Sequence, residues 1–198
     1  MNGKQQEVSC LDGTSYAADL IILGVGVVVN TGLAAAAGLC VENGIRVDAA
    51  TRTSQEHIYA IGDCTNHYNP HYQRYLRLES VQNAVDQAKV AAAAICGKDV
   101  TYDTIPWFWS DQYDVKLQMV GLSNASDKVL VRREVETPNR LSVWYFRENT
   151  LQAVDAINNA RAYMLGMKVL KMGVHLDQAK LIDPTVPLKP SELIQPVP

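Results

Sequence analysis

The first sixty residues contain two continuous apolar runs. Residues 18–26 read ADLIILGVG and residues 57–61 read HIYAI, the second ending abruptly at Gly62-Asp63. Runs without polar alternation predict strands covered on both faces, as in a parallel or mixed sheet that carries helices. A hairpin turn at Asp12-Gly13, after a strand over 8–11, precedes the first run. A short helix over 32–37 stopped by Gly38, and a strand over 45–48, fill the interval.

The middle of the chain changes to helical spacing. Residues 64–77 are polar and aromatic and are expected to form a loop, after which apolar residues recur every three or four positions. This spacing predicts an amphipathic helix over 79–96, with Glu79 or Ser80 near its start and Gly97 just past its end. Its apolar face consists of Val81, Val85, Ala88, Ala92 and Ile95.

Beyond Pro106 the pattern is that of an antiparallel sheet. Strand candidates at 115–119, 128–132, 141–146 and 151–154 are separated by turn residues. A helix is expected over 159–172, ending at Gly173, followed by a short helix near 177–182. The Pro-rich tail after Pro184 is expected to be extended. The predicted fold class is α/β, with an antiparallel sheet in the C-terminal part.

Composition and charge exclude several classes of protein. The 198 residues are 47% apolar and 20% charged, with a net charge of -3, which excludes disordered and collagen-like chains. Scattered basic residues argue against a nucleic-acid partner. No run approaches the roughly 18 apolar residues of a membrane span, and no secretory signal is visible, so a cytoplasmic location and no membrane contact are expected.

Metal and thiol chemistry have little support in the sequence. The four cysteines form no C-x-x-C pair, so free thiols are expected. His67 and His71 are four apart, but Pro70 lies between them, which makes a shared helical face and a metal site unlikely. No nucleophile with a catalytic partner is visible, so we expect neither a catalytic side chain nor a metal ligand.

Three groups of residues remain open to two interpretations each. Gly24-Val25-Gly26 lacks the third glycine and long helix of a phosphate-binding turn, so the pair either contacts a ligand or lets backbones pass closely. Asp63, at the end of a predicted parallel strand, either binds a ligand or caps the next turn. Glu79 either lines a ligand pocket or stabilises the helix by its charge.

The order of these motifs resembles the flavoproteins with two dinucleotide-binding domains. The segments RLESVQNA (residues 77–84) and PWFWSDQ (residues 106–112) are similar to the NADH-dependent ferredoxin reductases of bacterial oxygenase systems. This resemblance implies an incomplete Rossmann-like part followed by an α+β reductase domain. It places the end of an NAD-binding domain at 1–29, the second segment of an FAD-binding domain at 30–103, the C-terminal domain at 104–190 and a tail at 191–198.

The same resemblance implies a cofactor site. Asp63 would accept a hydrogen bond from a ribityl hydroxyl, and the Val81 N–H would meet the flavin pyrimidine oxygen, although the Val81 side chain could equally be core. Trp109, and with less support Trp107, would stack on the flavin or nicotinamide. The residues expected to contact cofactor are Gly24, Gly26, Gly62, Asp63, Glu79, Ser80, Val81 and Trp109.

The activity implied by the resemblance is electron transfer from NADH through FAD to an iron–sulfur ferredoxin or a rubredoxin. A homodimer is a further expectation. The chain departs from the family in having Val29 where a proline usually precedes the equivalent of Asn30, and in lacking any complete Gly-x-Gly-x-x-Gly turn. Because such turns bind the cofactor phosphates, the chain alone is expected to bind FAD poorly. The alternatives are a rubredoxin reductase and a truncated, non-catalytic module for dimerisation or partner binding.

Overall fold

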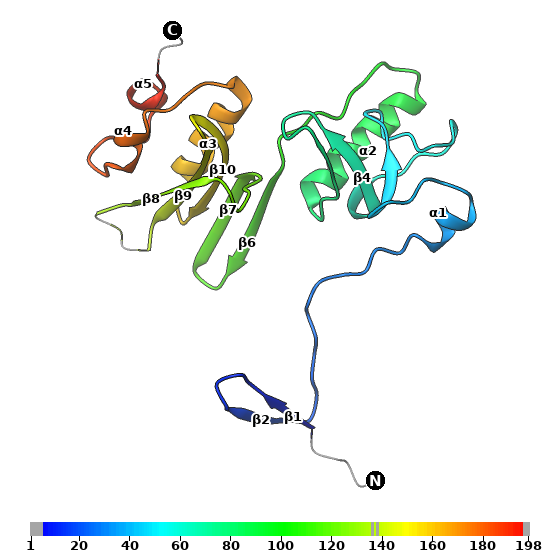
Figure 1. The fold of residues 1–198 in the computed structure, drawn as a ribbon, viewed down its shortest axis with the longest axis horizontal. Coiled ribbons are helices and arrows are strands. Elements are labelled where there is room, and N and C mark those ends of the chain that lie inside the picture. The colour runs from blue at the N-terminus through cyan, green and yellow to red at the C-terminus, as the bar shows by residue number, and fades with distance from the viewer. Residues whose placement is uncertain (1–5, 136, 138, 196–198) are drawn as a thin grey trace.

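The computed structural model describes residues 6–135, 137 and 139–195, which form three separate sheets (Figure 1). The strands are β1 (Gln6–Ser9), β2 (Ser15–Ala18), β3 (Ile45–Val47), β4 (Thr65–Asn69), β5 (Arg74–Leu76), β6 (Trp107–Gln112), β7 (Val115–Gly121), β8 (Lys128–Arg133), β9 (Leu141–Arg147) and β10 (Thr150–Ile157). The helices are α1 (Gly32–Ala36), α2 (Val81–Ile95), α3 (Ala160–Met172), α4 (Gln178–Ile182) and α5 (Pro190–Leu193), with a 3-10 turn η1 at Gly62–Cys64.

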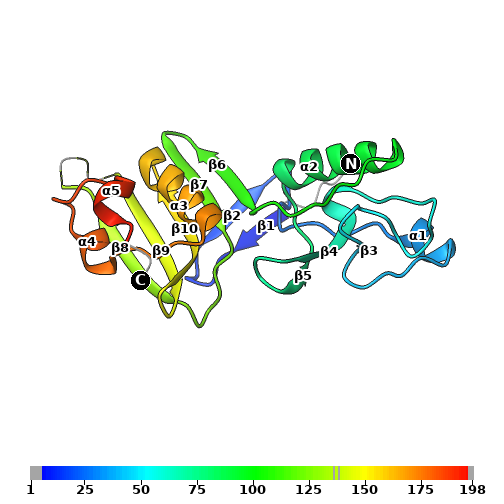
Figure 2. The same cartoon turned by 90° about the horizontal axis from the view of Figure 1, so that it is seen from above.

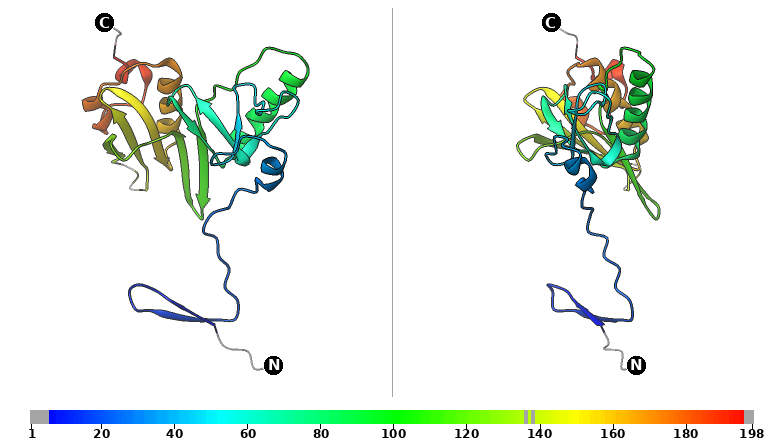
Figure 3. Two further views of the ribbon diagram at one scale, coloured as in Figure 1. Left: turned by 45° about the vertical axis from the view of Figure 1, so that its right-hand side comes forward. Right: turned by 90° about the vertical axis from the view of Figure 1, so that its right-hand side faces the viewer.

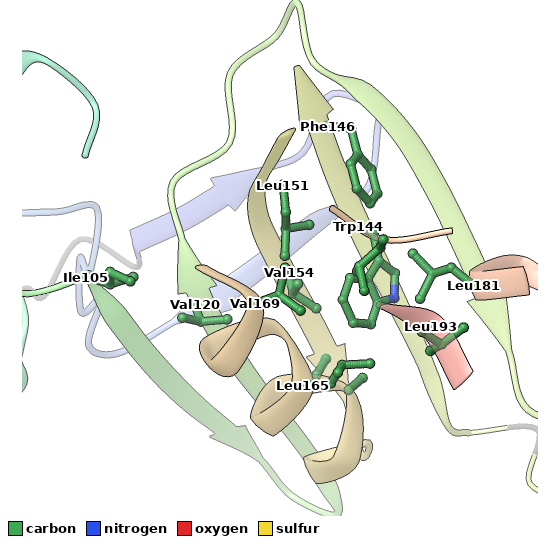
Figure 4. Packing of buried hydrophobic residues seen from close by; sticks show 13 residues of the cluster. Ile105, Val120, Trp144, Phe146, Leu151, Val154, Leu165, Val169, Leu181 and Leu193 are labelled. Carbon is green, nitrogen blue, oxygen red and sulfur yellow. The ribbon is translucent and has the colours of Figure 1, made fainter. Parts of the chain in front are cut away.

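The main hydrophobic core lies in the C-terminal part. A five-stranded antiparallel sheet has the order β6-β7-β10-β9-β8, and α3 packs on it (Figure 2). Strand β9 buries every second side chain, as an amphipathic strand does, and its Trp144 is fully buried. Figure 4 shows Trp144 beside Leu181 of α4 and Leu193 of α5. The two short helices therefore complete this core.

Helix α3 has the ends that the sequence predicted. The side chain of Asn159 accepts a hydrogen bond from the Ala162 N–H, and Gly173 ends the helix in the left-handed region, at φ +63°. In its middle, Gly166 lies close to the sheet. A Cβ atom there would stand 2.6 Å from Val154 Cγ2 and 3.2 Å from Val120 Cγ1. The absence of a side chain at Gly166 thus sets how closely α3 approaches β7 and β10.

We expect Gly166→Ala to destabilise the protein although alanine is the better helix former. Alanine gains about 1 kcal/mol of helix propensity, but overpacking a core typically costs about 1–3 kcal/mol. The free energy of unfolding in urea should fall by about 1–2 kcal/mol. Adding Val154→Ala, which removes the clashing methyl groups, should recover part of the loss relative to Val154→Ala alone. An unchanged or higher stability of the single variant would show that α3 moves away at no cost.

A buried arginine connects β8 to the C-terminal segment. Arg132 is 2% exposed, and its guanidinium donates to the backbone carbonyls of residues 181, 183, 184 and 186 at 2.9–3.3 Å. It also pairs with Glu134, with an Nε–Oε1 distance of 2.9 Å. The Arg132 hydrogen bonds and the Asn159 amide outweigh the effect of burial and lower the pKa of Glu134. Within the described residues, the segment 185–195 is therefore held against β8 and includes helix α5, which corrects the expectation of an extended tail.

The part of the chain between residues 30 and 103 buries mainly polar groups. Strand β4 runs parallel to β3 and antiparallel to β5, and α2 packs against η1. The buried polar side chains in this part are Thr51, Thr65, Asn66, His67, Asn69, Gln82, Asn83 and Gln87. The buried apolar ones are Ala34, Val47, Ala91 and Tyr102. Hydrogen bonds therefore hold this part together more than apolar contacts do.

The first apolar run is not a buried strand. The β1–β2 hairpin forms as predicted, but residues 19–31 continue as an extended, irregular segment, and the hairpin lies apart from the other sheets in Figures 1 and 3. Leu20, Ile22 and Val25 are 75–89% exposed. The prediction for 18–26 was wrong because an apolar run forms a strand only beside a hydrogen-bonding neighbour, and no described strand pairs with this one.

Two further predictions are corrected around β4. Residues 57–61 form no strand: only Tyr59 makes an isolated bridge, with Arg52, and Ile58 and Ile61 are about 40% exposed. The expected loop over 64–77 instead contains β4 and β5. The polar sequence of β4 concealed the strand: each of its buried side chains makes at least one hydrogen bond, although Asn66 Oδ1 and His67 Nε2 have no partner among the described residues. The sheet of the C-terminal part also has one more strand than predicted, β6. No helix in the described ranges is long and apolar enough to span a membrane.

Candidate functional site

The N-terminus of α2 is open to the surface. The Ser80 hydroxyl caps the helix by accepting a hydrogen bond from the Asn83 N–H at 3.1 Å. The Val81 side chain is 60% exposed, so it is not part of the core, and its N–H has no acceptor in the described part of the chain. Free N–H groups and the helix dipole favour negative charge at this position.

Helix α2 buries the face opposite to the one predicted. Val81, Val85 and Ile95 of the expected apolar face are 46–65% exposed. The buried side chains are instead Gln82, Asn83, Gln87 and Ala91. Each of the three polar ones has a partner: Gln87 bonds to η1, the Tyr102 hydroxyl donates to Asn83 Oδ1 at 2.9 Å, and Gln82 bonds to Asp86 and β6. An apolar stripe is therefore left facing outward, beginning at the open helix end.

Gly62 and Asp63 begin η1 next to this helix. Gly62 is buried at φ +79°, a conformation that favours glycine, and its N–H donates to Gln87 Oε1 at 2.7 Å. The Thr65 hydroxyl lies 2.8 Å from the Gly62 carbonyl oxygen and 2.9 Å from the same Gln87 atom. Asp63 itself is exposed. The buried Gln87 thus fixes the turn that presents the Asp63 carboxylate to solvent.

Arg77 connects Asp63 to Glu79. Its Nη1 atom donates to the Asp63 carbonyl oxygen at 3.4 Å and forms a short ion pair with the Glu79 carboxylate, and its Nε donates to Asn43. The Arg77 side chain is 18% exposed and Glu79 is 41% exposed. The structure therefore gathers Gly62, Asp63, Glu79, Ser80 and Val81 into one surface region, which we call the α2 entrance.

Strand β6 joins the α2 entrance from the other sheet. The Trp107 N–H donates to Gln82 Oε1 at 3.3 Å, and the Trp107 and Trp109 rings stack with centroids 5.5 Å apart. Trp107 packs against the main core and Tyr163, whereas Trp109 is 39% exposed. An exposed indole held by a stacked, anchored neighbour is a suitable surface for a planar ring.

Gly24 and Gly26 are not brought into this site. Both lie in the exposed segment 19–31, and no atom stands within 4 Å of where their Cβ atoms would be. By contrast, Gly44 and Gly62 do have close neighbours. The structure therefore offers no contact that explains the pair as a phosphate turn or as a close backbone crossing.

The two histidines singled out by their spacing have separate environments. His67 lies in β4 and is 2% exposed, with its Nδ1 3.4 Å from Gln87 Nε2 and its Nε2 without a partner in the described residues. Burial lowers the pKa of His67 to about 4. His71 is exposed and its Nε2 lies 3.1 Å from the Asp103 carbonyl oxygen. The described residues contain no cluster of three potential metal ligands.

The α2 entrance fits the ring end of a flavin better than its diphosphate. The free Val81 N–H offers a hydrogen-bond donor. The exposed apolar stripe of α2 offers an apolar surface, and the exposed Trp109 ring offers a face for stacking. The sequence contains no Gly-x-Gly-x-x-Gly turn, which is the usual diphosphate cradle. The residues present thus fit part of FAD.

The sequence analysis did not identify the buried residues whose hydrogen bonds position the α2 entrance. Gln82 and Gln87 were hidden because they occupy the face opposite the apolar stripe, and Tyr72 because it lay in an expected loop. For Gln82 and Gln87, the one available signal was the size and polarity of their side chains within a helix otherwise rich in alanine. In a buried position, a long amide can bond to two elements at once.

Two family models match separate parts of the chain. Residues 1–88 match the family model described as pyridine nucleotide-disulphide oxidoreductase, and residues 107–191 match the one described as reductase C-terminal. Putidaredoxin reductase of Pseudomonas putida is 41% identical over 96% of this chain and 45% of its own length. The ferredoxin reductase subunit of a 5,5'-dehydrodivanillate O-demethylase from Sphingobium is 42% identical over 92% of this chain and 44% of its own.

Solved structures give the same picture. The chain superimposes on the reductase of the covalent putidaredoxin reductase–putidaredoxin complex with a TM-score of 0.84, 41% identity, and coverage of 93% of this chain and 44% of that one. For the ferredoxin reductase of the Rhodopseudomonas palustris CYP199A2 system the TM-score is 0.87, with 38% identity and coverage of 97% and 48%. The chain spans about half the length of the relatives it matches. It belongs to the pyridine nucleotide-disulphide oxidoreductase family over residues 1–88 and to the reductase C-terminal family over residues 107–191.

Proposed function

We propose that this chain supplies the flavin-ring end and the C-terminal domain of an NADH-dependent ferredoxin reductase, an oxidoreductase that uses FAD and NAD. The observation that carries the proposal is the α2 entrance: an open helix N-terminus beside the Gly62-Asp63 turn and the stacked Trp107–Trp109 pair. Its acceptor would be a ferredoxin of an oxygenase system, as the names of the similar proteins suggest.

The residues of the α2 entrance have distinct roles in this proposal. The Asp63 carboxylate accepts a hydrogen bond from a ribityl hydroxyl, and the Val81 N–H faces the pyrimidine oxygen of the flavin ring. A helix N-terminus stabilises negative charge on that ring by about 0.3–2 kcal/mol. Glu79 orients the nicotinamide carboxamide, and Trp109 covers a ring face. FAD itself supplies the conversion of hydride to single electrons, so the protein contributes orientation and electrostatics.

The domain limits of the proposal follow the sequence analysis. Residues 1–29 would end an NAD-binding domain, residues 30–103 would form the second segment of an FAD-binding domain, and residues 104–190 would form the C-terminal domain. The exposed apolar segment 20–28 and the apolar stripe of α2 support this division, because each is a surface that a neighbouring domain would cover. We also propose a cytoplasmic location, supported by four free cysteine thiols.

The proposal is tested with a chimera in which this chain replaces the matching segment of putidaredoxin reductase. The relative then supplies the glycine-rich turns that this sequence lacks. We expect the purified chimera to retain FAD, visible as a flavin absorption spectrum, and to reduce ferricyanide with NADH. The isolated chain should do neither. A folded chimera without bound flavin at saturating FAD would contradict the proposal.

Within that chimera, Asp63→Ala is expected to weaken FAD binding tenfold to a hundredfold. A hydrogen bond to a charged group contributes about 1.5–3 kcal/mol, and one factor of ten corresponds to about 1.4 kcal/mol. FAD affinity is measured by fluorescence titration of the deflavinated protein. Asp99→Ala, which removes an exposed carboxylate beyond the end of α2, is the matched control and should bind FAD normally. Equal affinity of both variants would reduce Asp63 to a turn residue.

A further inference from the structure

Tyr72 lies where the two main parts of the structure meet. It belongs to the turn between β4 and β5, yet its hydroxyl donates to the Gln152 carbonyl oxygen in β10 at 3.0 Å. The Tyr72 hydroxyl oxygen in turn accepts a hydrogen bond from the Leu122 N–H, just after β7, at 2.8 Å. One phenol group thus bonds to two separate strands of the other sheet, using its donor and one of its acceptor positions.

The turn that carries Tyr72 is itself held in place. The buried Asn69 side chain accepts hydrogen bonds through Oδ1 from the backbone N–H groups of His71 and Tyr72, at 3.0 and 3.3 Å. Its Nδ2 lies 3.5 Å from the carbonyl oxygen of Thr104, in the segment that leads into β6. The Tyr72 ring therefore extends from a fixed base rather than from a free loop.

The opposite side of the contact is shaped to admit the hydroxyl. Gly121 has φ +78°, and a Cβ atom there would overlap the Gln152 carbonyl oxygen and stand 2.9 Å from the Tyr72 hydroxyl oxygen. The Gly121 N–H donates to the Pro106 carbonyl oxygen at 2.8 Å, one residue before Trp107. The Tyr72 contact and the start of β6 are thus only one residue apart along β7.

Two hydrogen bonds of the hydroxyl define this contact. A cavity of about 150 Å³ lies beside it, lined in part by Tyr72, Gln152 and Val169. Burial raises the pKa of Tyr72 to about 12, so the hydroxyl keeps its proton and remains a donor at any ordinary pH. The two hydroxyl bonds hold the end of the ring against β7 and β10.

We propose that Tyr72 is a positioning residue that sets the place of the Trp107–Trp109 pair relative to the α2 entrance. It bonds the β4–β5 turn to β7 and β10, next to the residues from which β6 starts. The hydrogen bond from the Trp107 N–H to Gln82 connects β6 to α2. The hydrogen bond from the Leu122 N–H to Tyr72 connects the end of β7, the strand paired with β6, to the β4–β5 turn. The inference rests on the proposed function only in taking Trp109 as a cofactor-facing ring.

The test compares Tyr72→Phe with Tyr68→Phe in this chain, without cofactor. Tyr68 is 46% exposed in the adjacent strand, and its hydroxyl has no partner among the described residues, so its variant makes the same chemical change without breaking a bond. The first measurement is hydrogen exchange of the Leu122 amide by NMR. The second is the exciton-coupled circular dichroism of the stacked indoles, assigned by its loss in Trp109→Phe. Near-ultraviolet circular dichroism of the buried Trp144 monitors the fold.

We expect Tyr72→Phe to speed Leu122 exchange about fivefold, the factor that corresponds to losing one hydrogen bond of about 1 kcal/mol. It should also diminish the indole coupling, whereas Tyr68→Phe should change neither. Faster exchange with unchanged indole coupling would overturn the positioning role and leave a local bond only. Unchanged exchange would overturn the bond itself.

A measurement on the unaltered chain keeps the inference testable if Tyr72→Phe does not fold. Leu122 lies outside any helix or strand, so Tyr72 is its source of protection, whereas Ser123 beside it is exposed. We expect Leu122 to exchange more slowly than Ser123, after correction for intrinsic rates. Equal exchange would overturn the inference. Both readouts are independent of FAD, so a chimera that fails to bind flavin contradicts the proposed function and not this inference.

Discussion

Arg132→Met is expected to lower the free energy of unfolding by about 3–5 kcal/mol, the usual cost of removing one partner of a buried ion pair. Methionine fills similar space but donates no hydrogen bond. The variant would leave the Glu134 carboxylate and the carbonyls of residues 181, 183, 184 and 186 without their shared donor. Because these carbonyls join α4 to the C-terminal segment, we expect the covering of Trp144 to loosen as well.

Arg133→Met is the matched control for this prediction. Arg133 is the next residue of β8, and its side chain is exposed because neighbouring strand residues point to opposite faces. Its replacement should change stability by no more than about 0.5 kcal/mol. Urea unfolding followed by tryptophan fluorescence measures both variants. Similar stabilities of the two would mean that the carbonyl groups find water or other donors at little cost.

Acidification should destabilise the protein through His67. Its pKa is lowered from 6.5 to about 4 by burial, so the unfolded chain takes up a proton at a pH where the folded chain resists it. The contribution of His67 to stability is therefore complete above about pH 6.5 and is lost progressively as the pH falls to about 4. The full loss is about 3 kcal/mol, at about 1.4 kcal/mol for each pKa unit.

This prediction is checked by urea unfolding at several pH values between 7 and 4 for the wild type and His67→Phe. Phenylalanine keeps an aromatic ring against Tyr102, whose ring centroid lies 4.9 Å away, and cannot be protonated. It should start less stable at pH 7, because Gln87 loses a contact, and should then lose less stability on acidification. His57→Gln, at an exposed position, should follow the wild type. Parallel pH curves for the wild type and His67→Phe would contradict the assignment.

Local signals in the sequence predicted the positions of helices and strands better than they predicted which side chains are buried. Ser80, Gly97, Asn159 and Gly173 cap or end helices through their own chemistry, so helices α2 and α3 were placed within two residues. The five-stranded sheet was also predicted, apart from β6, whose WFWSDQ sequence was interpreted only as an extended aromatic stretch.

Which face of a helix or strand is buried depends on residues distant in the sequence, and the predictions of burial were wrong for this reason. The run 18–26 has the pattern of a buried strand, but burial requires neighbours that no described strand provides. The polar face of α2 is buried because Gly62, Thr65 and Tyr102 each come within hydrogen-bonding distance, which a helical repeat cannot reveal. The structure brings together Gly62-Asp63 and Glu79–Val81, which are short contiguous motifs, and leaves out Gly24 and Gly26; the cofactor-binding role of these residues stays a prediction.

The buried amides of α2 also determine how this part of the protein responds to temperature. Exposing apolar surface on unfolding raises the heat capacity, whereas exposing polar surface lowers it. The region around Gln82, Asn83 and Gln87 exposes mainly polar groups when it unfolds, in contrast to the Trp144 core. Its stability curve is therefore flatter, and cooling weakens it less than it weakens the five-stranded sheet. We therefore expect the α2 entrance, which is held by directional hydrogen bonds, to lose less stability on cooling than the Trp144 core.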